Sequence, residues 1–513
     1  MKVPLNWLRE YVDIKIPIPE LVERLTIAGL EVESARMIGV PKPEGLSVKI
    51  ESEEPVWESD KIVIAEILDV KQHPDADRLT LPTVRLNDKD TKQLVTGAPN
   101  IKVGDSGQKV VVALTGAVLF DGHAKEKKLS KLKPGKIRGI ESDAMVCSEY
   151  ELGITEEHEG IIILDDNAPV GTPAAEYLGD IVLNIDVLPN MARCMSMIGI
   201  AREVAALTGA KLKIPDHDPK YTKEKIEGLV RVLIEDTDLS ARYSAMLIRD
   251  VEIKPSPEWM QRRLCYAGMR PVNNIVDITN YVMLEWGQPL HAFDYDKLTE
   301  RASDKGVIIS VRPAKKGETM TTLDETERKL SPKNLLIADA AGPIAIAGVT
   351  GGLETEVTDS TTSILLESAS FNQVSVRVTA REMSLPSEAS ARFSRGVHPE
   401  IVKPAAKRAA MLMGDLACGS VAKGMVDTYP IHVKPQKTKL SMKEVQRVLG
   451  IEVPIKDAKK ILESLEFEVE KDGKDKLEVT TPPHRMDIQV GSADLIEEIA
   501  RIYGYDQLPE TLL

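Results

Sequence analysis

A chain of 513 residues is several times longer than a typical domain, so we expect several domains rather than one large core. With 42% hydrophobic and 28% charged residues, its composition is that of a folded globular protein and excludes a mainly disordered chain. The formal net charge of -14 excludes a protein that holds nucleic acid through a positive potential over its whole surface. Any contact with RNA must therefore be local.

The cysteines and the N-terminal residues indicate the compartment. The four cysteines are scattered singly and form no C-x-x-C pair, which argues against a zinc or redox centre and fits a reducing environment. Charged residues interrupt the sequence from Lys2 to Lys15, so we expect no signal peptide. No apolar run approaches the length of about 18 residues that a membrane span requires. We predict a cytoplasmic protein that does not enter a membrane.

The N-terminal part is predicted to form one module from two segments, 1-39 and 153-210, with an insertion at 60-152 between them. The insertion consists of short β-rich runs, such as IVIAEILDV and KVVVALTGAVL, which are separated by Asn, Asp and Gly turns. This rhythm is typical of a small β-barrel. Helical periodicity returns at 199–209, where the apolar positions share one face and Gly209 can end the helix.

The segment 228-427 alternates predicted helices and strands, which indicates a mixed α+β domain. Its clearest helices are an Asn-capped segment that begins at Asn274 and ends at Gly287, and the Ala-rich run 404–416. The last module, 431-513, has the pattern helix, helix, strand, helix. The predicted fold class is therefore an α+β multidomain chain with an inserted barrel.

The insertion resembles a known RNA-binding module. The segments KIVIAEILDVKQHPDADRL, VTGAPNIKVGD, ALTGAVL and KIRGIESDAMVCSEYELGI resemble the tRNA-binding OB-fold module of several tRNA synthetases. The same region of this acidic chain carries a run of cationic side chains: Lys125, Lys127, Lys128, Lys131, Lys133, Lys136 and Arg138. Alone, such a run is more often a solvated surface loop. Within the matching flanks, we predict that it contacts tRNA beside the barrel.

The central domain carries the strongest set of motifs. The segments VNNIVDITNYVMLEWGQPLHAFD, IAIAGVTGGLETEV, SILLESASF and SLPSEASARFSRGVHPE resemble the editing domain of the phenylalanine–tRNA ligase beta subunit. In that family the domain hydrolyses tyrosine wrongly esterified to the phenylalanine tRNA. A second pocket is needed because the synthetic pocket cannot fully reject an isostere with one extra hydroxyl. The resemblance implies these editing-pocket residues: His291, Gly351, Glu367, Ser387 and Ala389.

These residues are predicted to have unequal roles. Glu367 would accept the tyrosyl hydroxyl, because facing phenylalanine would leave it unpaired at a cost of about 1–3 kcal/mol. His291 would help to position or deprotonate the water that attacks the ester. Gly351 and its neighbour Gly352 would let the ester approach backbone N–H groups. Ser387 stands where the family usually has threonine, which retains the hydroxyl but changes the pocket shape.

Each assignment has a structural alternative. His291 follows a helix end and would by itself more often be a partly buried packing residue. Glu367 interrupts an apolar strand and could be paired with Arg377 or Arg381. The two neighbouring glycines could simply form a turn. The occurrence of all four motifs in order, within matching flanks, favours the editing interpretation.

The final module contains TTPPHRMDIQVGSADLIEEIARIYGYDQLP, which resembles the beta-subunit segment that supplies carboxylates to a magnesium ion shared with the alpha subunit. The resemblance implies Asp487, Asp494, Glu497 and Glu498 as ligands, in a winged-helix-like module. The spacing of the second and third of these also fits a helix capping box. At 189–196 the family generally has P-N-R-G-D-C-L-S, whereas this chain has PNMARCMS, which predicts an altered structural joint.

The chain is not expected to make an aminoacyl-adenylate alone, because it has no class II ATP-binding pattern, no P-loop and no G-x-G-x-x-G. The resemblance implies an alpha subunit with the synthetic site, ATP as substrate of the holoenzyme, Mg2+ as cofactor and the phenylalanine tRNA as partner. It also implies an alpha2-beta2 tetramer, although this chain ends before the family's usual C-terminal domains. Two other functions stay open: a stand-alone hydrolase that edits without an alpha subunit, and a non-catalytic RNA-binding or assembly subunit.

Overall fold

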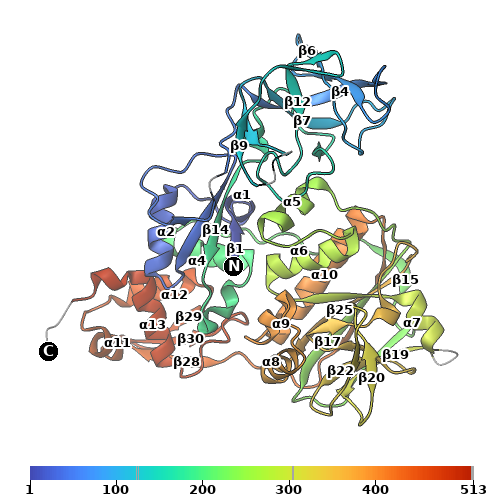
Figure 1. Ribbon diagram of the computed structural model, residues 1–513. Coiled ribbons are helices and arrows are strands. Elements are labelled where there is room, and N and C mark those ends of the chain that lie inside the picture. Colours follow the sequence, from blue (N-terminus) through green and yellow to red (C-terminus); the bar gives the residue numbers. More distant parts are fainter. Residues whose placement is uncertain (53, 123, 125, 303–305, 510–513) are drawn as a thin grey trace.

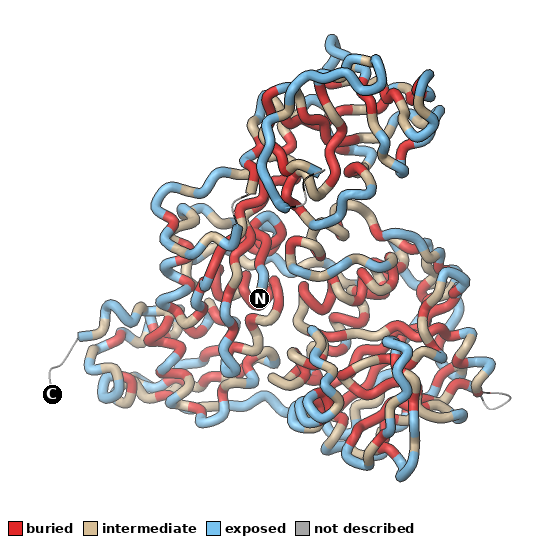
Figure 2. Tube along the Cα trace, in the orientation of Figure 1, coloured by how far each residue is buried: buried red, intermediate tan, exposed pale blue. Residues whose placement is uncertain are grey.

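The computed structural model describes residues 1–52, 54–122, 124, 126–302 and 306–509. It is a mixed α+β multidomain structure, as predicted. Figure 1 shows four lobes: an N-terminal lobe, an inserted lobe above it, a central lobe at the lower right and a C-terminal lobe at the lower left. Buried segments run through the interior of each lobe, and exposed loops surround them (Figure 2). None of the helices in the described part is long and apolar enough to span a membrane.

The N-terminal lobe is built from both sides of the insertion. Its 4-stranded sheet has the order β1-β14-β2-β3. β14 pairs antiparallel with both β1 and β2, so the chain returns to this sheet after the inserted lobe. The helix α4 ends as predicted at Gly209, whose φ is 69°. The elements of this lobe are β1 (Lys2–Pro4), α1 (Leu5–Leu8), α2 (Ile18–Ile27), β2 (Val32–Ile38), β3 (Lys49–Ile50), β14 (Asp180–Ile185), η1 (Pro189–Cys194) and α4 (Met197–Thr208).

The inserted lobe is centred on a 6-stranded sheet with the order β12-β7-β4-β5-β6, in which β13 also pairs with β7. Two hairpins, β8 with β9 and β10 with β11, are separate from this sheet. The elements are β4 (Ile62–Gln72), β5 (Thr80–Arg85), β6 (Thr91–Gln93), β7 (Lys109–Leu114), β8 (Val118–Phe120), β9 (Leu129–Lys131), β10 (Gly135–Ile137), β11 (Ile140–Ser142), β12 (Ala144–Val146), β13 (Ile163–Leu164) and α3 (Ala174–Tyr177).

The central lobe contains two larger sheets. The first has the order β15-β26-β17-β25-β18, with β27 pairing with β17, and the second has the order β16-β19-β22-β23-β24. Every residue of β25 is buried. The strands are β15 (Tyr221–Lys225), β16 (Val230–Ile234), β17 (Ser240–Arg249), β18 (Leu290–Asp294), β19 (Val307–Pro313), β20 (Thr319–Thr321), β21 (Glu327–Lys329), β22 (Leu335–Ala338), β23 (Pro343–Ile346), β24 (Thr350–Gly351), β25 (Ile364–Phe371), β26 (Ser420–Lys423) and β27 (Val426–Thr428).

Helices cover these sheets and position the ends of their strands. The predicted cap of α6 is confirmed: the Asn273 side chain accepts from the backbone N–H groups of Ile275 and Val276, and the helix ends at Gly287 in a left-handed conformation. β22 and β23 form an antiparallel hairpin. The helices are α5 (Glu258–Tyr266), α6 (Asn274–Trp286), α7 (Tyr295–Ala302), η3 (Leu353–Thr355), α8 (Gln373–Glu382), α9 (Glu388–Phe393), η4 (Pro399–Ile401) and α10 (Val402–Leu416).

The C-terminal lobe has a 3-stranded sheet, β28-β30-β29, with helices packed against it. The predicted pattern of helix, helix, strand and helix missed two strands. In β28 only Leu440 is buried among lysines and small polar residues, so its sequence resembles a loop. The elements are β28 (Lys437–Ser441), α11 (Met442–Leu449), α12 (Ile455–Ser464), β29 (Glu468–Lys471), β30 (Lys476–Thr480), α13 (Ser492–Tyr503) and η5 (Tyr505–Gln507).

Candidate functional site

Four of the five residues predicted for the editing pocket line one small cavity of about 70 Å³ in the central lobe. They are His291 from β18, Gly351 from β24, Glu367 from β25 and Ala389 from α9. The fifth, Ser387, does not line this cavity. We call this space the editing cavity. It draws on residues far apart in the sequence, which the two sheets and α9 bring together.

The pairing of β18 with β25 places His291 directly opposite Glu367. Residues directly opposed in an antiparallel pair point to the same face, with Cβ atoms about 4.5–5.5 Å apart. An imidazole and a carboxyl group therefore stand side by side at the cavity wall. Glu367 lies on β25, which pairs with β17 and β18, and His291 lies on β18, which pairs with β25. The backbone of this sheet therefore fixes the relative position of the two side chains.

Glu367 is buried without a cation. Its side chain accepts a hydrogen bond from the hydroxyl of Tyr243 on β17, with 3.0 Å between the oxygens. No arginine pairs with it in the described part of the chain, so the alternative pairing with Arg377 or Arg381 is wrong. Burial raises the pKa of Glu367 to about 8, which the hydrogen bond from Tyr243 only partly offsets. The group is therefore mainly a neutral carboxylic acid at pH 7 rather than the carboxylate that the sequence suggested.

His291 is partly buried and packs over Gly351. A Cβ atom built on Gly351 would lie 2.6 Å from the His291 ring, so only glycine leaves the ring in this position. On its other side the ring meets Phe293 edge-on, with 4.6 Å between ring centroids. Burial lowers the pKa of His291 to about 4, which keeps the imidazole neutral at pH 7. A neutral imidazole can accept a proton from water.

Ser387 does not line the editing cavity but contacts residues of its wall. It is the N-cap of α9, and its Oγ accepts from the backbone N–H of Ser390 at 3.1 Å. The same hydroxyl donates to the carbonyl oxygen of Val349 at 3.3 Å, and Val349 lines the cavity. Ser387 thus joins the helix that carries Ala389 to the loop that leads to Gly351. Its hydroxyl is occupied by these contacts.

One predicted role of the glycine pair is wrong. The backbone N–H of Gly352 donates to the carbonyl oxygen of Ile344 at 2.8 Å and is not available to an ester. A Cβ atom on Gly352 would also lie 2.7 Å from that oxygen. The glycine at this position therefore allows close packing of two backbone segments.

Sequence reasoning missed Tyr243 and the apolar wall formed by Ile346 and Phe393. Tyr243 lies within β17, most of whose residues are buried, and resembles an ordinary core aromatic. Its hydroxyl finds Glu367 only because β17 pairs with β25. The available signal was general: a tyrosine in a buried strand requires a hydrogen-bond acceptor, and Glu367 is an acidic residue in a neighbouring buried strand.

The cationic run of the inserted lobe lies on and around the two hairpins, and its described members are exposed. Lys125 lies outside the described residues. Two members are engaged with acidic neighbours: Lys127 lies 3.0 Å from Glu156, and Lys136 lies 3.2 Å from Glu141. Beside the hairpins is a groove of about 640 Å³, lined by residues that include Phe120, Met145 and Lys133. The lining contains one lysine, Lys133, and three acids, Asp121, Glu151 and Glu159. The exposed cations of the hairpins and the aromatic Phe120 are the kinds of side chain that contact a single strand of RNA.

The four carboxylates predicted as magnesium ligands do not come together. Asp487 and Glu498 are bound by arginines. The side chain of Asp494 accepts from three backbone N–H groups, including that of Gly491 at 3.1 Å. Glu497 is exposed. Among the described residues, no group of three or more His, Cys, Asp or Glu side chains is arranged to hold a metal ion.

The described residues therefore do not fit an ion held by this chain alone, and a magnesium ion shared with an alpha subunit stays a prediction. The predicted capping box is wrong in its register. Gly491 is the N-cap of α13, and Asp494 is the third helical residue, whose side chain reaches back to the N-cap N–H. Asp494 therefore occupies the third helical position of the capping box, where its side chain accepts from the N-cap N–H, and it is not the N-cap itself.

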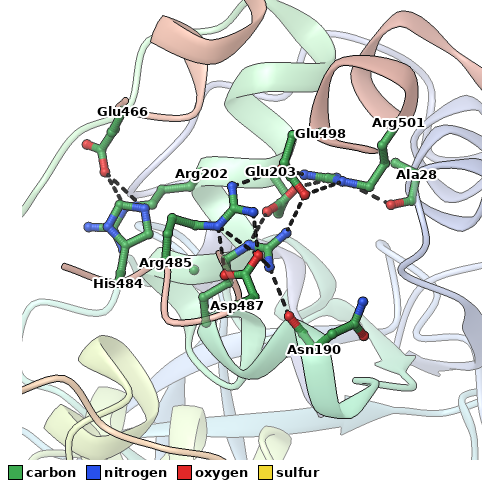
Figure 3. A network of polar contacts seen from close by, with 12 residues as sticks. Ala28, Asn190, Arg202, Glu203, Glu466, His484, Arg485, Asp487, Glu498 and Arg501 are labelled. Carbon is green, nitrogen blue, oxygen red and sulfur yellow. Dashed lines mark hydrogen bonds and ion pairs between the residues drawn. The ribbon is translucent and has the colours of Figure 1, made fainter. Parts of the chain in front are cut away.

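Asp487 and Glu498 belong to a buried set of alternating charges, the arginine–carboxylate cluster (Figure 3). Its members are Arg193, Glu203, Arg485, Asp487, Glu498 and Arg501. Arg193 on η1 lies 2.9 Å from Glu203 and 3.2 Å from Asp487. Arg501 on α13 lies 2.6 Å from Glu203 on α4. Since η1 and α4 belong to the N-terminal lobe, the cluster joins that lobe to the C-terminal lobe.

The arginines keep these carboxylates ionised. Burial alone would raise the pKa of Glu203, but Arg501 and then Arg193 outweigh it and lower the pKa to about 2. The pKa of Glu498 is likewise lowered, because Arg501, Arg485 and Arg193 outweigh burial. Arg193 lies in the segment 189–196, where the sequence departs from the resembled family, so this departure falls on the joint between two lobes.

Three family models match the chain. A putative tRNA binding domain matches residues 62–173, a B3/4 domain matches 239–418, and a tRNA synthetase B5 domain matches 438–505. The editing cavity lies within the B3/4 match, and the cationic hairpins lie within the tRNA-binding match.

Curated relatives match the whole chain. The phenylalanine–tRNA ligase beta subunit of Dehalococcoides mccartyi is 44% identical over 521 residues, which cover 99% of this chain and 61% of the relative. That of Moorella thermoacetica is 46% identical over 520 residues, which cover 100% of this chain and 60% of the relative. The chain thus spans about 60% of the length of these relatives. An N-terminal fragment of the Pyrococcus horikoshii beta subunit, a solved structure, is 16% identical with a TM-score of 0.34 and covers 63% of this chain and 87% of the fragment.

Proposed function

We propose that this chain, which belongs to the family of phenylalanine–tRNA ligase beta subunits, hydrolyses tyrosine wrongly attached to the phenylalanine tRNA. The observation that carries this proposal is the editing cavity, in which a neutral His291 and a buried Glu367 lie side by side and Gly351 packs against the imidazole. ATP-dependent attachment of phenylalanine would require an alpha subunit with the synthetic site, in an alpha2-beta2 assembly.

Selectivity for tyrosine would come from Glu367. Tyr243 occupies one oxygen of its carboxyl group and leaves the other for a ligand. The phenolic hydroxyl of tyrosine can pair with that oxygen, whereas phenylalanine would bury it without a partner at a cost of about 1–3 kcal/mol. That cost corresponds to a preference of about 5- to 150-fold. Ile346 and Phe393 supply apolar wall for the ring.

Hydrolysis would use His291 as the proton acceptor. An aminoacyl ester is already activated, so a positioned water and a base within hydrogen-bond reach are the main requirements. A neutral Glu367 places no negative charge beside the oxyanion that develops on the ester. The hydroxyl of Ser387 is used in capping α9 and in binding Val349, which supports attack by water rather than by a serine nucleophile.

The inserted lobe would bind the tRNA. Its groove and exposed cationic hairpins are proposed to form the binding face of an OB-fold module. Because the chain carries a formal net charge of -14, this binding should depend on the local cations and weaken steeply with salt.

The test is deacylation of Tyr-tRNA and Phe-tRNA by the purified chain, alone and with an alpha subunit. We expect faster hydrolysis of Tyr-tRNA, loss of hydrolysis in His291→Ala, and loss of the preference for tyrosine in Glu367→Gln. Glu382→Gln changes an exposed carboxylate on α8 and should behave like the wild type. If the wild type hydrolyses neither tRNA in either form, the editing proposal fails.

One observation favours a second candidate, a stand-alone editing hydrolase. All residues that line the editing cavity come from the central lobe of this chain. Editing by the isolated chain at the rate of the assembled one would support this candidate. If His291→Ala and Glu367→Gln leave deacylation unchanged, a non-catalytic role in RNA binding or assembly is favoured instead.

A further inference from the structure

A second cavity, of about 370 Å³, lies where the N-terminal, central and C-terminal lobes meet. We call it the junction cavity. Its lining includes Asn190 on η1, Gly287 after α6, Arg395 after α9 and His484 after β30. Figure 3 labels Asn190 and His484 near the arginine–carboxylate cluster, of which Arg193 and Asp487 also line the junction cavity. None of these lining residues belongs to the proposed editing chemistry.

Several buried N–H donors at the junction cavity have no acceptor. Within the described residues, the Nε of Arg395 and the indole Nε1 of Trp286 make no hydrogen bond. The Nη2 of Arg193 also makes none and lies 3.5 Å from the nearest carboxylate oxygen, on Glu498. An unsatisfied buried donor is costly, and these three show that acceptor oxygens are in short supply in the wall of the junction cavity.

The lining also keeps an uncompensated positive charge. Of the residues that line the junction cavity, Asp487 is the only acid, and Arg193 and Arg485 already bind it. Arg202 is paired with Glu466. Arg395 has no carboxylate within ion-pair distance in the described part of the chain, and the one hydrogen bond of its side chain is a long one, 3.4 Å, to the carbonyl of Ala391. An anion is therefore the class of ligand that this cavity favours.

The junction cavity adjoins the editing cavity. On one segment, Gly287 lines the junction cavity and Pro289 lines the editing cavity. On another segment, Arg395 lines the junction cavity and Phe393 lines the editing cavity. Two residues of extended chain span at most about 7 Å, so the same two segments form walls of both spaces. An RNA end that brings its ester to His291 would carry its backbone phosphates past this junction.

We propose that the junction cavity is a phosphate site, and that during editing it holds a backbone phosphate of the tRNA 3′ end. Arg395, a lining cation without a carboxylate partner among the described residues, donates to the phosphate oxygens. The identity of the RNA occupant rests on the proposed editing function, whereas the phosphate site itself does not.

The phosphate site is tested by calorimetric titration of inorganic phosphate into the full chain. We expect binding by the wild type, affinity about tenfold weaker in Arg395→Gln and partial recovery in Arg395→Lys, because one charge-assisted contact is lost and then restored without its planar fork. Arg377→Gln removes an exposed arginine on α8 and should leave binding unchanged. Equal phosphate binding in Arg395→Gln and the wild type, or none in the wild type, would overturn the site. Thermal unfolding of each variant shows whether the fold is intact.

The RNA occupant is tested by comparing Tyr-tRNA with the tyrosyl ester of adenosine, which has no backbone phosphate. In Arg395→Gln we expect the KM for Tyr-tRNA to rise about tenfold with kcat unchanged, and both constants for the adenosine ester to stay as in the wild type. The dependence of log(kcat/KM) on log salt should lose a slope of about 0.7, the value for one phosphate contact on a single strand.

The other outcomes are decisive as well. Equal effects on both substrates, or weaker phosphate binding with an unchanged KM for Tyr-tRNA, would overturn the RNA occupant. Weaker association of Arg395→Gln with the alpha subunit, with deacylation unchanged, would overturn it in favour of an acidic protein segment. If the wild type hydrolyses neither substrate, the editing function fails, and the phosphate titration still decides the site.

Discussion

Glu367 and Glu203 are both buried carboxyl groups, yet their pKa values are shifted in opposite directions. Glu367 in the editing cavity has no cation beside it among the described residues and accepts one hydrogen bond, from the hydroxyl of Tyr243, so burial raises its pKa to about 8. Glu203 in the arginine–carboxylate cluster lies between Arg501 and Arg193, which overcome burial and lower its pKa to about 2. Burial alone therefore does not decide the charge. The fully paired group joins two lobes, and the underpaired group is ready for a ligand.

The largest expected effect is on the paired group. Glu203→Gln should lower the free energy of unfolding by about 3–5 kcal/mol, because it leaves buried arginines without their counter-charge. Urea unfolding measures this loss. Glu20→Gln is the matched control, since Glu20 forms an exposed pair with Arg24 on α2 and should cost at most about 0.5 kcal/mol. A loss at Glu203 as small as that at Glu20 would show that the cluster does not hold the lobes together.

The pH dependence of stability should have opposite signs at the two groups. The pKa of Glu203 is lowered from 4.5 to about 2, so its contribution is complete above pH 4.5 and is lost as the pH falls towards 2. The pKa of Glu367 is raised from 4.5 to about 8, so its folded state loses stability as the pH rises from 4.5 to 8. Thermal unfolding should be measured for the wild type and both variants from pH 2 to pH 8. Glu203→Gln should lack the part of the stability loss that the wild type shows below pH 4.5, and Glu367→Gln should lack the part that it shows between pH 4.5 and pH 8. Parallel curves for all three proteins would contradict the assignment.

A smaller effect is expected from Tyr243→Phe, which removes the hydrogen bond that holds down the pKa of Glu367. The loss should be about 1 kcal/mol, with the preference for Tyr-tRNA over Phe-tRNA reduced about fivefold. Deacylation measured against pH should move to higher pH. Tyr221→Phe, at an exposed position on β15, serves as the control. An unchanged pH profile in Tyr243→Phe would mean that Glu367 does not govern selectivity.

The smallest effect is expected from Ser387→Thr. Threonine retains the hydroxyl that caps α9 and binds Val349, so stability should change by less than about 0.5 kcal/mol. Ser387→Ala loses both contacts and should cost about 1 kcal/mol, with a higher KM for Tyr-tRNA because the wall of the editing cavity loosens. Thermal unfolding and deacylation kinetics separate the two variants. Equal stability and equal KM in Ser387→Thr and Ser387→Ala would show that the hydroxyl does not stabilise the wall of the editing cavity.

Local features of this protein could be predicted from its sequence, and long-range partners could not. The ends of α4 and α6 at Gly209 and Gly287 follow from apolar spacing and from the left-handed conformation that glycine allows. The spacing of the carboxylates on α13 indicates how that helix begins. It gives no information about Arg193, which belongs to another lobe and pairs with Asp487 and Glu498. For that reason the four predicted magnesium ligands do not cluster among the described residues, and their role at an ion shared with an alpha subunit stays a prediction. Tyr243 was missed likewise, because only the pairing of β17 with β25 gives it a role.

The sheet of the N-terminal lobe imposes an order on synthesis. β14 lies between β1 and β2, so β1 has no strand to pair with, and β2 has only the short β3, until the chain has been translated to residue 185. At about 5–20 residues per second, β2 waits on the order of ten seconds for β14. The inserted lobe emerges during that interval and has its own core to close around. On the ribosome, the first residues to leave the tunnel should therefore be among the last to find their final neighbours.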